Sequence, residues 1–121
     1  WRQFDSPRQS ETHVPLDEYE RTLDDLVGRT KPRVRGLVLM TPCFVEPNPA
    51  DAMRAMLDTY GDAVKRIAAR HDAYLVDTQA AFDTVLHAIP SAAIAWDRVH
   101  PNHIGHMVLA RAFLNAVGFA W

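Results

Sequence analysis

Hydrophobic positions in the first part of the chain predict a loop followed by an amphipathic helix. Residues 1–14 are polar and show no period, which indicates a loop. From Pro15 to Gly28, apolar residues recur every three or four positions on one helix face: Leu16, Tyr19, Leu23, Leu26 and Val27. Proline is favoured at the first helical position and glycine just past the last one. We therefore expect a helix over 15–28 that ends at Gly28.

A longer helix and two short strands are predicted next. Helical spacing continues from Pro49 or Asp51 to about Arg70, through Met53, Met56, Leu57, Tyr60, Val64, Ile67 and Ala68. Residues 34–40 (VRGLVLM) are almost continuously apolar, which is typical of a parallel strand covered on both faces. Residues 74–76 (YLV) form a second short run of the same kind.

The rest of the chain predicts two more helices and, with them, the fold class. One helix is expected over 78–86, Pro90 opens a loop, and a last helix runs from about Pro101 to Val117, with Gly118 in the stop position. A strand, a long helix and a second strand are typical of a parallel crossover, so we expect an α/β fold with helices on both faces of the sheet.

A parallel sheet of only two strands would leave strand edges unpaired and faces of the four predicted helices uncovered. The chain also starts at Trp1 instead of Met. We therefore expect residues 1–121 to be the C-terminal portion of a single domain, a three-layer α/β/α sandwich with a parallel sheet, whose N-terminal part is absent.

Composition narrows the functional classes. The 121 residues are 48% hydrophobic and 23% charged, which is usual for a globular domain and excludes membrane-spanning, collagen-like and disordered chains. Thirteen basic and fifteen acidic side chains give a formal charge of −2, without the basic cluster of a nucleic-acid-binding protein. A single cysteine, Cys43, excludes an internal disulfide. We expect no nucleic-acid partner and no membrane span.

The densest group of chemically active side chains is DRVHPNHIGH, residues 97–106, at the start of the last helix. Asp97 precedes His100 by three positions, and a proline follows the histidine. This spacing places both side chains at one turn, where the carboxylate can accept a hydrogen bond from one imidazole nitrogen at about 2.6–3.2 Å. The other nitrogen is then left as a base.

The run DRVHPNHIGHMVLA resembles the last conserved block of the SGNH (GDSL-type) esterases and lipases. In that family an Asp-x-x-His motif supplies two members of a Ser-His-Asp triad. The strand ends LMTP at 39–42 and LVDT at 75–78 are also similar to the second half of that flavodoxin-like fold. The resemblance implies a serine ester hydrolase, acting on an acyl or carbohydrate ester, with no metal or organic cofactor.

Carried over to this chain, the resemblance makes His100 the general base and Asp97 its orienting partner. It places the nucleophilic serine and the oxyanion hole in the missing N-terminal part of the same domain, because none of the serines here stands in a GDS or GxSxG context. The partner is a small-molecule ester substrate. Phe44, in the loop after the first strand, and Trp1 are the candidate substrate-binding residues, and plain packing is an equally good interpretation for Phe44.

Several alternatives stay open at this point. Asp97, His100 and His103 could ligate a metal in a metallohydrolase, although side chains three apart on a helix diverge around its axis. The motif could also be structural in a non-catalytic fragment. Asp77 could face a ligand crevice, or it could cap the helix that follows it. Cys43 could be a nucleophile, or it could be a packed thiol.

Overall fold

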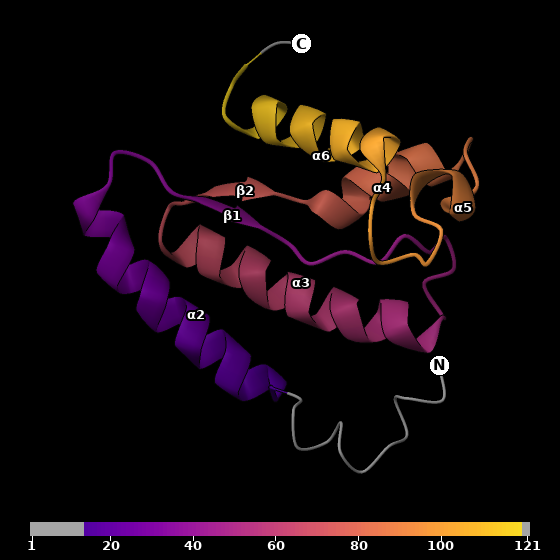
Figure 1. The fold of residues 1–121 in the computed structure, drawn as a ribbon. Helices are drawn as coiled ribbons and strands as arrows, with labels where there is room; N and C mark the ends of the chain where they lie inside the picture. The colour runs from indigo at the N-terminus through magenta and orange to yellow at the C-terminus, as the bar shows by residue number, and fades with distance from the viewer. Residues whose placement is uncertain (1–13, 120–121) are drawn as a thin grey trace.

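The computed structural model describes residues 14–119 and shows a small parallel sheet between helices (Figure 1). In chain order the elements are α2 (Leu16–Thr30), the 3₁₀ helix η1 (Lys31–Arg33), β1 (Val38–Met40), α3 (Ala52–Arg70), β2 (Tyr74–Val76), α4 (Thr78–Leu86), α5 (Ser91–Ile94) and α6 (His103–Ala116). None of these helices has both the length and the apolar character needed to cross a membrane.

The sheet pairs β1 with β2 in parallel, with Val38 opposite Tyr74 and Met40 opposite Val76. The connecting helix α3 packs against both strands, and α2 packs against α3 on that side of the sheet (Figure 1). On the other side α6 contacts β2, α4 and α5. Helices therefore cover both faces of a parallel sheet, which confirms the predicted α/β class.

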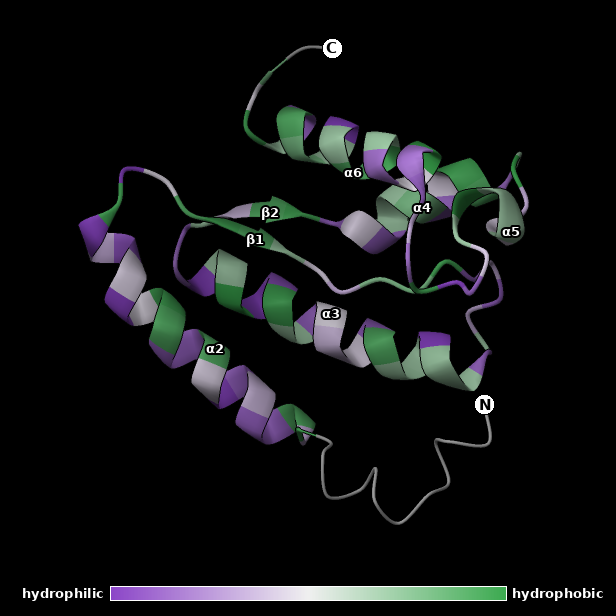
Figure 2. Cartoon of the chain, in the orientation of Figure 1, coloured by the Kyte–Doolittle hydropathy of each residue, from purple (hydrophilic) through white to green (hydrophobic). Residues whose placement is uncertain are grey.

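Hydrophobic residues run along both strands, whereas each helix carries a mixture of hydrophobic and hydrophilic residues (Figure 2). On one side of the sheet, α3 buries Ala63, Val64, Ile67 and Ala68. On the other side a separate cluster is formed by Val45, Phe82, Ile94 and Ala95. Val45 and Ala95 also hydrogen-bond to the backbone of Arg98, so this second cluster supports the turn that carries the Asp-x-x-His motif.

Most predicted elements are present, and the differences have local causes. The predicted end of the first helix at Gly28 is wrong, because α2 continues to Thr30 and passes into η1. A Cβ at Gly28 would lie 3.4 Å from His71 Cε1, at the short end of ordinary van der Waals contact, so α2 passes close to the end of α3 at this position. The strand predicted over 34–40 is reduced to β1, since its partner β2 is equally short.

The region after α4 also differs from the prediction. The loop expected at Pro90 contains the one-turn helix α5. Four residues are too few to show a helical period, which is why the pattern did not reveal it. The last helix begins at His103 instead of Pro101, and Gly118 follows it with φ +82°, as a glycine in the stop position does.

Candidate active site

The turn that carries Asp97 and His100 lies between α5 and α6, beyond the carboxyl ends of both strands (Figure 1). Asn102 fixes the start of α6, because its Oδ1 accepts hydrogen bonds from the N–H groups of Ile104 (2.9 Å) and Gly105 (3.3 Å). Its Nδ2 donates to the Ala93 carbonyl at 2.9 Å. One side chain thus joins α6 to α5 across the turn.

Gly105 allows α6 to pack this closely. A Cβ at this position would lie 2.5 Å from Pro101 Cβ and 3.1 Å from Ile94 Cγ2. Only glycine fits without displacing the residues that directly follow His100. The Pro-Asn-x-x-Gly part of the motif therefore has a structural reason of its own.

Asp97 and His100 form the hydrogen bond that their spacing predicts. Asp97 Oδ2 lies 2.6 Å from His100 Nδ1, and Oδ1 accepts from the backbone N–H groups of His100 (2.8 Å) and Val99 (3.0 Å). The imidazole hydrogen bond, with the two backbone bonds, holds the pKa of Asp97 well below its usual range.

The ionised carboxylate determines the tautomer of the ring. A carboxylate can only accept hydrogen bonds, so Nδ1 of His100 must carry the proton. In the neutral form of the ring, Nε2 is then left with its lone pair. The His100 side chain is 80% exposed and that of Asp97 is 23% exposed, so the pair presents an accessible base on a partly covered carboxylate.

Arg98 lies between Asp97 and His100 in the sequence, and the sequence pattern indicated no role for it. Its backbone is left-handed, with φ +66°. Its carbonyl accepts from the Val45 N–H at 2.9 Å, and its Nη1 donates to Glu46 Oε2 at 2.6 Å. Its Cζ lies 5.0 Å from the centroid of the Phe44 ring, at cation–π distance. Glu46 is 52 positions away in the sequence, so no local pattern could have indicated the pair.

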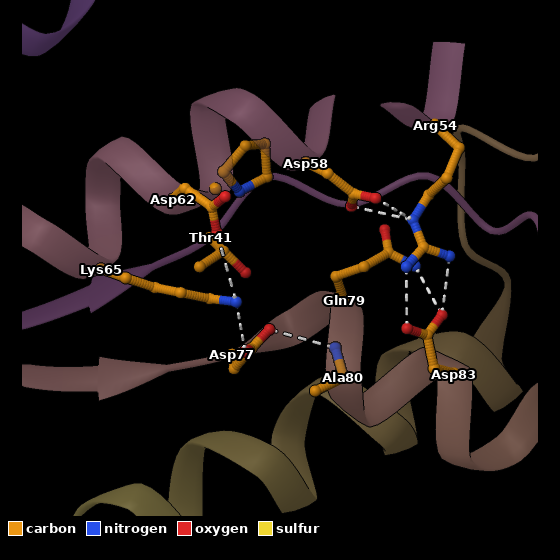
Figure 3. Close-up of a pocket in the computed structure, with 11 residues that line it drawn as sticks. Thr41, Arg54, Asp58, Asp62, Lys65, Asp77, Gln79, Ala80 and Asp83 are labelled. Atoms are coloured by element: carbon orange, nitrogen blue, oxygen red, sulfur yellow. Dashed lines mark hydrogen bonds and ion pairs between the residues drawn. The ribbon is translucent and has the colours of Figure 1, made fainter. Parts of the chain in front are cut away.

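Arg54, on α3, ties the loop after β1 to α4, and its contacts with Asp58 and Asp83 are drawn in Figure 3. Its Nη1 donates to the Glu46 carbonyl at 2.8 Å, its Nε to Asp58 Oδ1 at 2.8 Å, and Nη1 and Nη2 each donate to Asp83 at 2.9 Å. Burial lowers the pKa of the guanidinium, but the two carboxylates outweigh that effect and raise it. Arg54 is a permanent buried cation that fixes Glu46.

A polar pocket of ≈ 290 Å³ lies between α3 and the start of α4 (Figure 3). Asp77 lines it, caps α4 by accepting from the Ala80 N–H at 3.1 Å, and pairs with Lys65 at 2.8 Å. The capping interpretation of Asp77 is confirmed; the residue also lines a pocket, and a ligand there stays a prediction. Asp97 and His100 do not line this pocket.

The remaining predicted residues take up packing positions or fall outside the described region. Phe44 is only 2% exposed, and its N–H donates to Gln79 Oε1 at 2.8 Å, so its substrate contact stays a prediction. Cys43 packs against the cluster formed by Val45, Phe82, Ile94 and Ala95. Burial raises the pKa of its thiol, which disfavours the nucleophilic thiolate. Trp1 lies outside the described residues.

The metal-site alternative is not favoured by the geometry. Within residues 14–119, no three or more His, Cys, Asp or Glu side chains are grouped so that they could hold a metal ion. His103 begins α6, and its position does not bring it together with Asp97 and His100 around a common point.

The chain is similar to known proteins in both sequence and structure. No family model matches the chain. The chain is 56% identical over 121 residues to an acetylxylan esterase from Geobacillus stearothermophilus. The aligned region covers all of this chain and 55% of that protein. A crystal structure of this esterase matches with a TM-score of 0.93. An alpha/beta hydrolase from the metagenome of Lake Arreo, Spain, is also 56% identical, with a TM-score of 0.92 over 98% of this chain and 54% of its own.

Mutant structures of the Geobacillus esterase bear on the motif. Its catalytic mutants replace a serine, an aspartate and a histidine by alanine. That aspartate and that histidine are three positions apart, as Asp97 and His100 are here. In a further mutant the tryptophan directly before the aspartate is replaced, and Trp96 stands at that place in this chain. The chain spans about half the length of the esterase, to which it is similar in sequence and in fold over its own full length.

Proposed function

We propose that the protein containing these residues is a serine ester hydrolase of the SGNH (GDSL) type, in which His100 is the general base and Asp97 its orienting partner. The observation that carries this proposal is the 2.6 Å hydrogen bond between Asp97 Oδ2 and His100 Nδ1, on a carboxylate whose pKa is strongly lowered. The similarity to an acetylxylan esterase with a catalytic serine, aspartate and histidine supports it.

His100 takes up and gives back one proton in each of the two stages of the proposed mechanism, acylation and deacylation. Nε2 of His100 first takes the proton of the serine hydroxyl while the serine oxygen attacks the ester carbonyl. The imidazolium then gives this proton to the departing alcohol, which leaves an acyl-enzyme. A water molecule, deprotonated by the same nitrogen, then attacks the acyl-enzyme, and the imidazolium returns this proton to the serine oxygen as the acid is released. Throughout the cycle Asp97 keeps the proton on Nδ1 and stabilises the imidazolium.

The serine and the oxyanion hole belong, in this proposal, to an N-terminal part of the same domain. Residues 1–121 then form the C-terminal portion of a three-layer sandwich, and both parts meet at the carboxyl edge of the sheet. The proposed substrates are acetyl esters of xylan and of xylo-oligosaccharides, by similarity to the relative.

The test uses the full-length protein and acetylated xylo-oligosaccharides. We expect acetate release that a serine-directed phosphonate abolishes in proportion to covalent labelling, and that dialysis against a chelator leaves unchanged. Activity that survives stoichiometric phosphonate labelling, or that a chelator removes and added zinc restores, would overturn the proposal in favour of metal-assisted hydrolysis.

A further inference from the structure

We propose that Arg98 is a positioning residue for the Asp97–His100 pair, held between Glu46 and Phe44 so that it fixes the turn on which both residues stand. The inference rests on the proposed function, because it concerns how the general base is held. It assigns roles to Arg98 and Glu46, which neither the sequence motif nor the triad chemistry uses.

The catalytic turn needs support from outside itself. Among the described residues, the hydrogen bonds that Asp97 accepts come from Val99 and His100, within the same turn. They set the shape of the turn but not its place relative to the sheet. The His100 side chain is 80% exposed, so little packing within residues 14–119 orients the ring.

Arg98 adopts a backbone conformation that arginine ordinarily avoids. Within residues 14–119, only Asp72 and Arg98 have a positive φ without being glycine. A left-handed residue with a Cβ is unfavourable, because the Cβ comes too close to the following carbonyl oxygen. Glycine would remove this cost at once, so the arginine side chain must contribute something that glycine cannot. Backbone strain of this kind persists where surrounding contacts impose it, often at functional sites.

Those contacts come from residues 44–46. Arg98 Nη1 lies 2.6 Å from Glu46 Oε2, and the two side chains are 27% and 15% exposed. The guanidinium lies over the Phe44 ring, 5.0 Å from its centroid. The Arg98 carbonyl accepts from the Val45 N–H at 2.9 Å. Side chain and backbone are therefore attached to the same short segment, and Nη1 is also 3.8 Å from Asp51 Oδ2 at the start of α3.

The segment 44–46 is itself anchored to the helices. Gln79 on α4 accepts from the Phe44 N–H at 2.8 Å, and buried Arg54 on α3 donates to the Glu46 carbonyl at 2.8 Å. A continuous series of short contacts thus leads from α3 and α4 through residues 44–46 to Arg98. Nε2 of His100 is placed by this series, and a shift of about 1 Å in such a group can cost about 100-fold in rate.

The experiment compares Arg98→Gly, Arg98→Met and Arg98→Lys in the full-length protein. Arg98→Gly keeps the turn and removes the side chain, so it separates backbone shape from the contact with Glu46. We expect Gly and Met to lower kcat about 10- to 100-fold with KM within about twofold of wild type, because substrate binding is intact and the base is misplaced. Lysine keeps the charge and should restore part of kcat.

A second readout does not depend on activity. The Nδ1 proton of His100 should give a downfield NMR resonance in the wild-type protein, because it is hydrogen-bonded to an ionised carboxylate. In Arg98→Gly and in Glu46→Gln we expect this resonance to shift and broaden. In the double variant Arg98→Met/Glu46→Gln the loss in kcat should be no larger than in the worse single variant, since one interaction is removed in both.

Matched controls come from similar features elsewhere in the chain. Asp72→Gly relaxes the other positive φ, and Arg66→Met removes an exposed ion pair with Glu20. Both should keep wild-type kcat and an unchanged resonance.

The outcomes separate this inference from the proposed function. Wild-type kcat together with an unchanged Nδ1 resonance in Arg98→Gly would overturn the positioning role, even in an active esterase. A protein without esterase activity whose resonance still depends on Arg98 and Glu46 would support the positioning role and refute the proposed function.

Discussion

Replacing Arg54 by methionine tests the packing that supports the candidate site. Methionine fills much of the same space without charge or donors. The change leaves Asp58 and Asp83 without their shared cation and the Glu46 carbonyl without its donor. Removing one partner of a buried ion pair costs far more than the pair contributes, because the remaining charges stay where water reaches them poorly.

The expected magnitude follows from the exposure of each partner. Losing one partner of a fully buried pair costs about 3–5 kcal/mol. The Arg54 side chain is 8% exposed, but those of Asp58 and Asp83 are 37% and 38% exposed, so water recovers part of the loss. We therefore expect the free energy of unfolding to fall by about 3 kcal/mol, the lower end of that range, which is about a 100-fold change in the unfolding equilibrium.

Urea denaturation of the full-length protein measures this loss. The midpoint should fall while the slope m stays constant, since the native surface changes little. Arg66→Met is the control, because its partner pair with Glu20 is exposed and should contribute under about 1 kcal/mol. Equal losses for the two variants, or a loss below about 1 kcal/mol for Arg54→Met, would refute the reasoning.

Three further predictions concern single residues. Asp97→Asn should lower kcat about 10⁴-fold with little change in KM, because an amide no longer fixes the tautomer of the base; a kcat within tenfold of wild type would contradict this. Gly105→Ala should destabilise by about 1–2 kcal/mol in thermal unfolding, since overpacking against Pro101 exceeds the gain in helix propensity; an unchanged or raised Tm would oppose it. Burial raises the pKa of Asp77, but Lys65, the Ala80 N–H and the charge of Arg54 together outweigh this and lower it, so its stabilisation is complete above pH ~3.9 and is lost as the pH falls through the lower folded value. The stability difference between wild type and Asp77→Asn should therefore shrink from pH 7 to pH 3, and a constant difference would exclude the ion pair as its cause.

Features that depend on neighbouring residues could be predicted from the sequence. Helical spacing gave α3 to within a few residues, and β2 and α4 have the predicted bounds. The Asp97–His100 hydrogen bond was also predictable, because both ends lie in one turn and the spacing limits their distance. Asn102 could have been found in the same way, as a helix cap directly before α6.

Features that depend on distant residues could not be predicted. Glu46 is 52 positions from Arg98, and Asp83 is 29 positions from Arg54, and many other acidic side chains could have paired with them equally well. Gly28 misled because α2 continues past it to Thr30 and packs there against the end of α3, close to His71. One sequence shows local preferences, whereas tertiary contacts decide which of them prevail.

The assignment of His100 as the general base can be tested most directly by one comparison. Acetate release from acetylated xylo-oligosaccharides is measured in single turnovers for the full-length wild type, His100→Ala and His103→Ala. We expect His100→Ala to lose about 10⁴-fold or more in rate, as removal of a triad member does, and His103→Ala to stay within a few-fold of wild type. Equal losses in the two variants, or a wild-type rate in His100→Ala, would contradict the assignment.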